Sequence, residues 1–598
     1  MSICETVDVV FQNLSYTVKD KVQSRKQKKE IKKLILDNLT GSFLQGKLTG
    51  IMGPSGAGKT SLMEVLSGQS KTGVVTGNLY LNGHSSDINT IKKISGFVFQ
   101  DDIILKTMTV KEALYMSALL RLPETITDEE KINKVNEMIT LLHLESCKDT
   151  LVGDSLSRGI SGGERKRLSV GMEMLTNPSI IFLDEPTSGL DTYSAYSLIS
   201  NLKDLTITGS NLVNYFSSIG YQCPEYTNPS DYIFMNILNP VIVEDKINNL
   251  NVKNIKEKDI YILDSFTKSG MEENIINRCN LNNSNQIILS EKNLKYKSGF
   301  CLQLKFLLNR HLKNLFRNRA ILRTKLGQSF GLGLIIGLTF LNIPGSDAKA
   351  QIQDRNGSLF ISSFSQVLLP IIGTLALFSI ERPVILREVS SGYYGIFAYY
   401  LSKMMIEIPL QIIITFITCT IIYWLCLFQK TFKKYIIFIG IIVLGSLCGL
   451  SIGTAIATAA ENVNIALQFA PFCIIPLILF SGLLINCDSI PPYFTWIQYI
   501  SPIRYMYQEV YKNEFKGLFY KGQSLEHYID EMNFNKISTT LALCLLAGIT
   551  ILLLLLAYFI LFCSIKRTLS KTKYYLNQNV ENNLNVSKEN ITRENILI

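Results

Sequence analysis

A glycine-rich octet near the start of the chain holds the first residues whose types and spacing predict chemistry. Residues 53–60 read Gly-Pro-Ser-Gly-Ala-Gly-Lys-Thr, which is a complete G-x-x-x-x-G-K-[ST] phosphate loop. Its glycines let backbone N–H groups wrap phosphate oxygens, because side chains at these positions would obstruct them. Lys59 supplies a cation for the β- and γ-phosphates, and the Thr60 hydroxyl is expected to hold Mg²⁺. The octet therefore predicts a nucleotide site.

Two acids follow an apolar strand further along the chain. Residues 180–183 read Ile-Ile-Phe-Leu and lead into Asp184 and Glu185. Asp184 is placed to bind the water shell of Mg²⁺, and Glu185 to polarise the attacking water as general base, so Glu185 is the predicted catalytic residue. Acids at a strand tip are often only solvated, but four apolar residues followed by Asp-Glu disfavour that interpretation. Gln100 precedes this motif and can reach the metal. The predicted Mg²⁺ ligands are Thr60, Gln100 and Asp184.

A third motif lies between these two. Residues 161–164 read Ser-Gly-Gly-Glu and are expected to begin a helix, whose N-terminus is a ready anion site. This order of motifs is typical of ATP-binding cassettes, in which two cassettes close face to face over ATP. The predicted residues that grip the partner's γ-phosphate are Ser161, Gly162, Gly163 and Glu164. The residues expected to couple the two sites across the interface are Ser188, Gly189, Leu190 and Asp191.

The elements around the motifs fit an α/β domain. Alternating residues over 7–17, and the runs 33–36 and 48–52, predict strands, the last of which feeds the phosphate loop; a helix is expected from Thr60. Strands and helices alternate to about residue 235, so residues 1–238 form the predicted cassette domain. Tyr16 is either a stacking platform for adenine or an ordinary strand aromatic. The residues predicted to contact ATP are Gly53, Pro54, Ser55, Gly56, Ala57, Gly58, Lys59, Thr60, Ser61, Gln100, Asp184 and Tyr16.

Composition divides the 598-residue chain into a soluble front and a membrane back. Hydrophobic residues make up 47% and the mean hydropathy is +0.20, which is too apolar for a purely soluble enzyme. The apolar excess is concentrated in the second half. A net charge of +10 fits basic cytoplasmic flanks, and no basic and aromatic surface motif supports a nucleic-acid partner.

The back half predicts an all-α transmembrane domain over residues 303–565, after a polar linker at 239–302. A basic amphipathic helix over 303–325 is expected on the membrane surface. Six apolar runs then reach the length of about 20 residues that a spanning helix needs. They lie at about 326–343, 357–379, 397–427, 435–459, 464–486 and 539–563.

Topology follows from the even number of runs. Six spans place the C-terminus in the cytosol with the nucleotide domain, and residues 566–598 are expected to be a disordered cytosolic tail. Lysines 430, 433 and 434 disagree, since this topology puts them outside. Cys487 is expected to face the exterior, where an intermolecular disulfide and a free thiol are both open.

Several blocks resemble one group of transporters. The chain resembles half-transporters of the ATP-binding cassette subfamily G, the White and breast-cancer-resistance group, in which the nucleotide domain comes first. The resemblance covers about residues 7–235 and 303–565. The matching blocks are residues 51–61, 96–102, 221–224, 381–388, 391–394, 480–482 and 488–491.

This resemblance implies a function and partners. It implies a dimer of two half-transporters, homomeric or heteromeric, that uses ATP and Mg²⁺ to export lipids, sterols or other amphipathic compounds. It also implies a multi-pass protein of the plasma membrane or of an organelle membrane. Glu381, Arg387 and Glu388 would lie on the helix that relays cassette motion to the membrane domain, although a solvated loop is the alternative for these charges. The cargo and the particular membrane stay open.

One segment departs from the group's pattern. After Asp191 such a cassette continues to a strand that ends in a switch histidine, yet the chain's four histidines are His84, His143, His311 and His527. Sequence typical of a later position resumes after about residue 209. Two interpretations are open. The transcript is incomplete, or the cassette is degenerate and binds ATP but hydrolyses it poorly. In the second case the chain would be a membrane subunit that regulates or complements an active partner.

Overall fold

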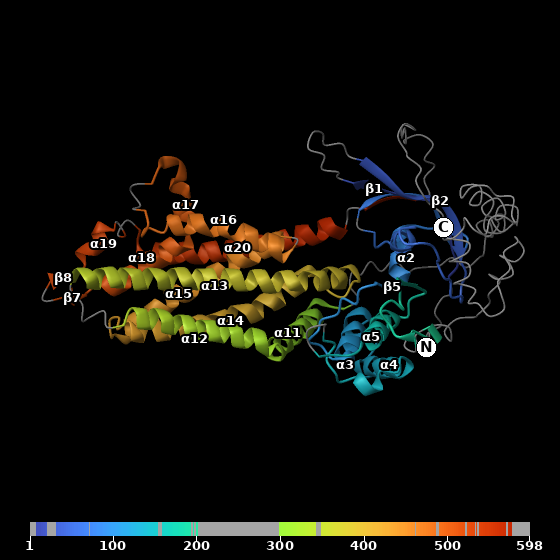
Figure 1. Ribbon diagram of the computed structural model, residues 1–598, viewed down its shortest axis with the longest axis horizontal. Coiled ribbons are helices and arrows are strands. Elements are labelled where there is room, and N and C mark those ends of the chain that lie inside the picture. The colour runs from blue at the N-terminus through green and yellow to red at the C-terminus, as the bar shows by residue number, and fades with distance from the viewer. Residues whose placement is uncertain are drawn as a thin grey trace, which may run out of the picture. The chain divides into compact units, whose positions relative to one another are not determined.

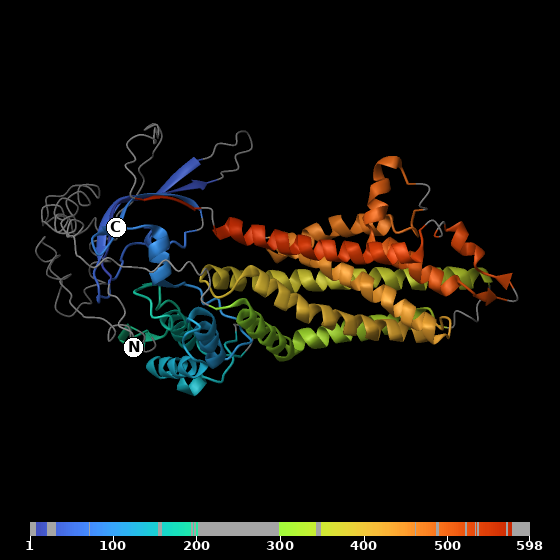
Figure 2. The same cartoon turned by 180° about the vertical axis from the view of Figure 1, so that it is seen from behind.

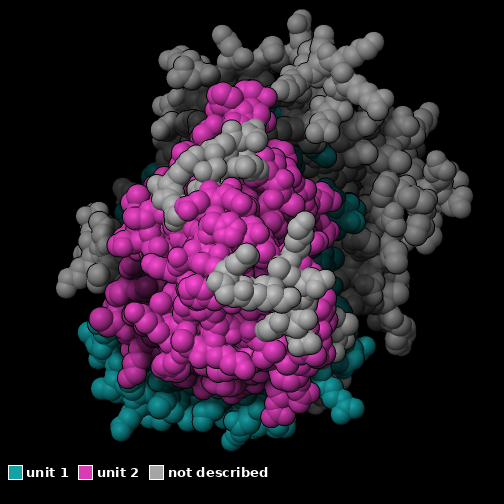
Figure 3. Space-filling view, turned by 90° about the vertical axis from the view of Figure 1, so that its left-hand side faces the viewer, with its two compact units in different colours: residues 1–294, 568–598 teal, residues 295–567 magenta. Residues whose placement is uncertain are grey.

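The protein is described by a computed structural model, and the statements below concern the residues that it describes. These are residues 7–20, 31–70, 72–153, 158–192, 195–196, 199–200, 298–341, 348–460, 462–485, 490–520, 523–532, 534, 537–569 and 572–576. Contacts divide the chain into two compact units (Figure 3). Unit 1 comprises Met1–Leu294 and Thr568–Ile598, and unit 2 comprises Lys295–Arg567. The predicted linker over 239–302, apart from residues 298–302, lies outside the described residues, as does Cys487.

Two sheets form the strand framework of unit 1. The larger has the order β2-β1-β3-β4, with β9 parallel to β3, and the smaller pairs β5 with β6 in parallel (Figure 1). The strands are β1 (Val9–Asp20), β2 (Ile31–Phe43), β3 (Gly73–Leu81), β4 (His84–Ser85), β5 (Ser95–Val98), β6 (Ile180–Leu183) and β9 (Thr572–Leu576). The strands predicted at 7–17 and 33–36 are confirmed within β1 and β2.

The strand predicted at 48–52 is a correction. These residues belong to no strand in the described part of the chain. Strand structure requires a hydrogen-bonded neighbour, and the ladders of the described sheets run elsewhere. The phosphate loop is therefore entered from an irregular segment.

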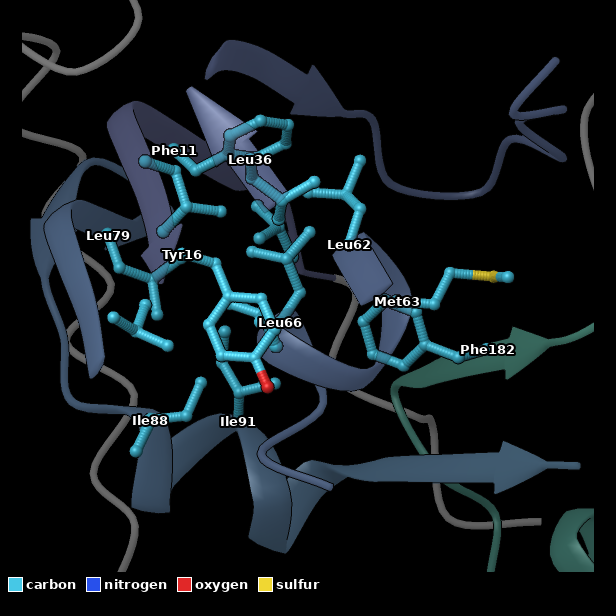
Figure 4. Packing of buried hydrophobic residues seen from close by; sticks show 14 of the residues in the cluster. Phe11, Tyr16, Leu36, Leu62, Met63, Leu66, Leu79, Ile88, Ile91 and Phe182 are labelled. Carbon is cyan, nitrogen blue, oxygen red and sulfur yellow. The ribbon is translucent and has the colours of Figure 1, made fainter. Parts of the chain in front are cut away.

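Helices pack on these sheets and on one another; the first two close the hydrophobic core around the larger sheet, and the fifth packs on β5. They are α1 (Lys59–Leu66), α2 (Ile88–Ile94), α3 (Val110–Arg121), α4 (Asp128–Leu141) and α5 (Gly162–Met174), with a short 3-10 turn at Glu145–Cys147. In Figure 4 Leu62 and Leu66 of α1 point toward Leu36 and Tyr16 of the sheet. Burying a side chain such as Leu36 contributes about 1.5–3 kcal/mol, so the core anchors the helix that follows the phosphate loop.

Two glycines of β3 are required by close approach to β1. Gly73 and Gly77 have φ of +122° and +136°, which L side chains rarely adopt. A Cβ on Gly73 would lie 2.6 Å from the carbonyl oxygen of Thr17, and one on Gly77 would lie 2.9 Å from that of Asn13. The register of β1 against β3 shifts between Gln12 and Ser15, so Gly77 accommodates a bulge there.

Unit 2 is helical, and Figures 1 and 2 show its long helices running side by side. The helices are α11 (Phe300–Arg317), α12 (Arg319–Thr339), α13 (Ala348–Ser390), α14 (Ile396–Leu425), α15 (Phe432–Ala459), α16 (Val463–Leu479), α17 (Thr495–Ile500), α18 (Pro502–Phe515), α19 (His527–Glu531) and α20 (Thr539–Leu569). A 3-10 turn at Pro492–Phe494 and a hairpin of β7 (Phe519–Tyr520) and β8 (Gln523–Ser524) complete the described part.

Four described helices are long and apolar enough to cross a membrane by length and composition. They are Ala350–Phe378, Ile396–Leu425, Phe432–Ala459 and Thr539–Thr568. The other two predicted spans also contain helices. However, α12 carries Arg319, Arg323 and Lys325 in its first two turns, and α16 has 17 residues. At 1.5 Å per residue α16 covers about 25 Å, which is less than the roughly 30 Å of a hydrocarbon core.

The basic helix predicted over 303–325 is divided in two. Asn318 has ψ of 66°, which ends α11, and its side-chain oxygen accepts a hydrogen bond from the N–H of Ile321 in the first turn of α12. One face of α11 is buried, including Arg310 and His311. An amphipathic helix is therefore confirmed over Phe300–Arg317, but the prediction of one helix to 325 is wrong, and Arg310 packs inside unit 2.

A stripe of glycines brings α15 against α13. Gly449 and Gly453 are one turn apart, and a Cβ on them would lie 2.4 Å from the carbonyl oxygen of Val367 and 2.8 Å from the Cα of Ile371. Backbones approach this closely in membranes only where residues are small. Gly445 continues the stripe toward Met506 of α18.

The predicted tail at 566–598 is partly ordered. Helix α20 runs to Leu569, and residues 572–576 form β9 on the sheet of unit 1. The physical reason is that Tyr574 packs against the core cluster while the strand gains a backbone ladder with β3. Residues 577–598 lie outside the described part of the chain.

Candidate ATP site

The phosphate loop is shaped by left-handed glycines and closed by its lysine. Gly56 and Gly58 have φ of +85° and +91°, and a Cβ on Gly58 would lie 2.9 Å from the Leu36 side chain. The Lys59 ammonium donates to the carbonyl oxygens of Gly53 and Pro54 at 2.8 and 2.9 Å. Lys59 also begins α1, so the positive charge and the free N–H groups of a helix N-terminus lie together.

Parallel strands bring the acids and Gln100 to one place. β5 and β6 pair in register from Ser95 opposite Ile180 to Val98 opposite Leu183, so the residues after both strands emerge side by side. Gln100 Nε2 donates to Glu185 Oε2 at 2.7 Å. Thr60 Oγ1 donates to Asp184 Oδ1 at 3.0 Å.

The backbone at Glu185 is in a conformation that is rare outside glycine. Its φ is +42° and its carboxylate is exposed, whereas Asp184 is buried. Such backbone persists only where surrounding structure holds it, and it is frequent at functional sites. Here the turn from Glu185 O to Ser188 N, at 3.0 Å, and the side-chain bond to Gln100 hold it. The arrangement aims one acid outward and keeps the other beside Thr60.

The oxygen donors fit Mg²⁺ bound together with a nucleotide. No cluster of three His, Cys, Asp or Glu side chains suited to a metal occurs among the described residues. A hydroxyl and a carboxylate, Thr60 and Asp184, instead lie within hydrogen-bond distance of each other. Mg²⁺ typically takes one or two protein oxygens and completes its shell with water and phosphate oxygens. The Thr60–Asp184 pair has the ligand types that such a half-site needs.

Residues 161–164, called the signature below, form the capped start of a helix. Ser161 is the N-cap of α5, and its side chain accepts a hydrogen bond from the N–H of Glu164, whose carboxylate accepts from the Ser161 N–H at 2.8 Å. Burial raises the pKa of Glu164, but the hydrogen bonds from Ser161 outweigh it and leave the pKa lowered. Ser161 and Gly162 are exposed, and a Cβ on Gly162 would lie 3.7 Å from the carbonyl oxygen of Gly189. The signature and the 188–191 segment are therefore neighbours.

Lys166 is a residue that sequence reasoning missed. It lies on the buried side of α5, and its ammonium donates to the carbonyl oxygens of Phe99 and Gln100 at 3.2 and 2.7 Å. It also pairs with Asp102 at 3.1 Å. The signal was its spacing, because Lys166 follows Gly163 by three residues and precedes Val170 by four, on the inward face of the helix. It ties the signature helix to the segment that carries Gln100.

The structure corrects the prediction that Tyr16 contacts ATP. Its side chain is 5% exposed within the core cluster, and its hydroxyl donates to the carbonyl oxygen of Thr72. Figure 4 shows the ring among other core side chains such as Leu66. A stacking platform needs an open ring face, so the prediction of adenine stacking is wrong and the strand-aromatic interpretation holds. The predicted switch-histidine gap falls after about residue 209, outside the described residues.

The three charged residues predicted to couple the domains lie in helix α13, where Arg387 and Glu388 are buried and Glu381 is half-buried. Glu388 accepts two hydrogen bonds from Arg310 of α11, at 2.8 and 2.9 Å. Glu381 accepts two from Lys403 of α14, both at 2.9 Å. Arg387 is also buried. The alternative of a solvated loop does not fit these residues, and their partners Arg310 and Lys403 were not foreseen.

Burial and charge perturb the groups around these pairs. Burial raises the pKa of Glu381, but the Lys403 ammonium more than offsets it, so the pKa falls to about 2. His311 lies nearby and its pKa is lowered well below the ordinary value, by burial first and by Lys403 and Arg310 second. Glu381 is therefore ionised and His311 neutral at pH 7.

Two family models match the chain. The family described as ABC transporter matches residues 36–188, which include the phosphate loop, the signature and both acids. The family described as ABC-2 type transporter matches residues 302–515. An ATP-binding cassette joined to a membrane domain of this type defines an ATP-driven membrane transporter.

Relatives along most of the chain identify the group. The broad substrate specificity ATP-binding cassette transporter ABCG2 of Bos taurus is 31% identical over 86% of this chain and 86% of its own length. ABC transporter G family member 1 of Dictyostelium discoideum is 28% identical over 86% of this chain and 78% of its own length. ABC transporter G family member 7 of Arabidopsis thaliana is 28% identical over 87% and 75%. The chain belongs to the ABC transporter family, as a half-transporter of subfamily G.

Proposed function

We propose that the chain is one half of a dimer that exports lipids, sterols or other amphipathic compounds, with Glu185 as the catalytic base and Mg²⁺ bound with ATP. The observation that carries the proposal is the pairing of Thr60 with Asp184 and of Gln100 with Glu185, directly beside the phosphate loop. The acid of the metal half-site and the water-directing acid then follow the same strand, β6, and Gln100 follows its neighbour β5. ATP binding and ATP-driven membrane transport follow from the family.

The residues divide the work of hydrolysis. Lys59 and the loop N–H groups would bind the phosphates, and Thr60 and Asp184, with Gln100 as the third predicted ligand, would hold Mg²⁺, which would neutralise charge on the phosphate oxygens. Glu185 takes a proton from the attacking water, and Gln100 orients Glu185 through the 2.7 Å bond. Ser161 and Gly162, exposed at the start of α5, contact the ATP bound by the second chain. One chain thus supplies half of each site.

An apolar face in the membrane domain supports an amphipathic cargo. Phe469 and Phe472 of α16 are 54% and 75% exposed, and their ring centroids lie 5.8 Å apart. Exposed aromatic rings favour sterol or acyl groups over ions. We assign the protein to the plasma membrane or an organelle membrane, with the nucleotide domain and C-terminus in the cytosol.

The sequence also favours a second candidate. The chain has four histidines, and none lies between Asp191 and the membrane domain, where a switch histidine is expected. A chain without that group would bind ATP and turn it over poorly. It would then regulate or complement an active partner.

The test is ATP turnover by the full-length protein in lipid nanodiscs. Glu185→Gln is expected to lower turnover by about 10²- to 10⁴-fold, since it removes the base but not the binding residues. Glu129→Gln is the matched control, because Glu129 is an exposed carboxylate on α4.

Three outcomes separate the candidates. Turnover that depends on Glu185, with efflux of labelled sterol or phospholipid from vesicles, supports the exporter. Binding of labelled ATP without turnover in the unsubstituted chain supports the second candidate. Turnover that survives Glu185→Gln would refute the assigned base.

A further inference from the structure

We propose that residues 572–576 are a docking strand that binds the edge of β3 in the same chain and connects the last membrane helix to the phosphate-loop helix α1. The proposal goes beyond ATP-driven transport, since it concerns how the end of the chain is fastened. The segment that occupies this edge of β3 is the chain's own strand at 572–576.

The backbone of β9 covers one edge of β3. The two strands are parallel, with Gly73 opposite Thr572 and Gly77 opposite Leu576. β1 pairs along the other edge of β3, and β4 covers only Tyr80 and Leu81 on the β9 side. Without β9, residues 73–77 would present an unpaired strand edge among the described residues. Addition of a strand to such an edge is a recurring mode of peptide recognition.

The middle residue of the strand is anchored in the core. Tyr574 packs against the core cluster of unit 1, and its hydroxyl shares a hydrogen bond with the hydroxyl of Ser70. Burial raises the pKa of Tyr574 to about 12, in accordance with an enclosed position. The strand is therefore recognised by a side chain as well as by its ladder, which distinguishes a specific register from a sliding contact.

Ser70 follows α1 in sequence and is hydrogen-bonded to its last turn. The N–H groups of Gln69 and Ser70 donate to the carbonyl oxygen of Glu64, at 2.8 and 3.0 Å, and so terminate that helix. Lys59 and Thr60 occupy the first turn of the same eight-residue helix. Tyr574 thus binds at the C-terminal end of the helix whose N-terminal end carries the nucleotide-binding lysine. A force on β9 is applied to α1 through one hydrogen-bonded residue.

The N-terminal end of β9 is joined to the last membrane helix by a short connection. Helix α20 ends at Leu569 and β9 begins at Thr572, so two residues separate them. The three residue steps from Leu569 to Thr572 span at most about 11 Å, which leaves little slack. Movement of the end of α20 therefore either pulls on the strand or releases it. Docking of β9 should in turn favour the α1 arrangement that binds ATP.

A cysteine pair tests the docking itself. Val74 and Lys573 face each other in the register, so Val74→Cys with Lys573→Cys should form a disulfide in the full-length protein. Val74→Cys with Leu576→Cys is the control, because three residues along a strand displace the partner by about 10 Å. Peptide mass spectrometry identifies the bond among the natural cysteines. No bond at 74–573, or a bond joining two chains, would overturn docking within one chain.

Two shortened chains test the connection to α1. A chain ending at Lys571 lacks the strand, and a chain ending at Gln578 keeps it. The first should melt about 4 °C or more below the second and bind ATP at least about fivefold more weakly. Tyr574→Phe, which keeps the ring, should fall between them. Equal melting and equal affinity in the two shortened chains would overturn the connection.

These measurements are independent of transport. Disulfide formation, melting and ATP binding require no hydrolysis, so they remain readable in Glu185→Gln. A chain that docks its strand but does not export would contradict the proposed function only. A chain that exports but forms no 74–573 bond would contradict the docking strand only.

Discussion

Replacing Lys166 by methionine should destabilise the nucleotide domain more than any exposed substitution. Methionine keeps the unbranched apolar stem but removes the ammonium. The carbonyl oxygens of Phe99 and Gln100 then lose a donor, and Asp102 loses its counter-charge. The segment that holds Gln100 would be released from α5.

The magnitude follows from burial. The side chains of Lys166 and Asp102 are 3% and 11% exposed. Removing one member of a buried ion pair costs about 3–5 kcal/mol, and the partial exposure of Asp102 places the value near the lower limit. For a domain of this size about 3 kcal/mol corresponds to a melting temperature lower by roughly 6–12 °C.

The assay is thermal denaturation of the purified full-length protein, following the transition that ATP shifts. Lys134→Met on the exposed side of α4 is the matched control. Adding Asp102→Asn to Lys166→Met should recover part of the loss, because the uncompensated charge is then removed. A Lys166→Met protein that melts within about 2 °C of the control, or a double variant that is no more stable than the single one, would refute the reasoning.

Three further outcomes are expected. Gly449→Ala should separate α13 from α15 and lower the free energy of unfolding by about 1–3 kcal/mol. Gly440→Ala on α15 should lower it much less, because nothing lies within 4 Å of the added Cβ. Thermal aggregation in detergent compares the two variants. Tyr16→Phe removes the hydrogen bond to Thr72 and should lower the free energy of unfolding by about 1 kcal/mol, and an unchanged free energy of unfolding in denaturant would contradict that contribution. The lowered pKa of Glu381 means that its stabilising charge is fully present above its ordinary pKa of 4.5 and is lost as the pH falls toward about 2; acid unfolding of unit 2 should shift accordingly in Glu381→Gln, and an unchanged acid profile would contradict the buried pair.

Motif spacing predicted where the candidate ATP-site residues lie, because their placement depends on local backbone geometry; their roles stay predictions. A phosphate loop needs glycine where φ is positive, and Gly56 and Gly58 have that conformation. An apolar strand followed by two acids places Asp184 and Glu185 at a strand end whatever else surrounds it. The α/β and all-α halves likewise followed from periodicity and hydropathy.

What spacing could not predict are contacts between distant segments. Lys166 reaches Asp102 only because α5 packs beside the end of β5, and no local pattern records that. Arg310 looks like a membrane-surface charge until α13 brings Glu388 to it. The strand at 572–576 was expected to be disordered, since its partner β3 lies about 500 residues away in sequence.

Two ion-paired carboxylates of α13 limit how the membrane domain can move. Glu381 and Glu388 are seven residues apart, roughly 10 Å along the helix, and each grips a different neighbour, Lys403 on α14 and Arg310 on α11. If α13 slid gradually, both carboxylates would lose their cationic partners at once inside an apolar environment. Leaving such charges unpaired costs free energy at every intermediate position. Helices α11, α13 and α14 should therefore move as one rigid body between a few discrete arrangements, in each of which both ion pairs are formed.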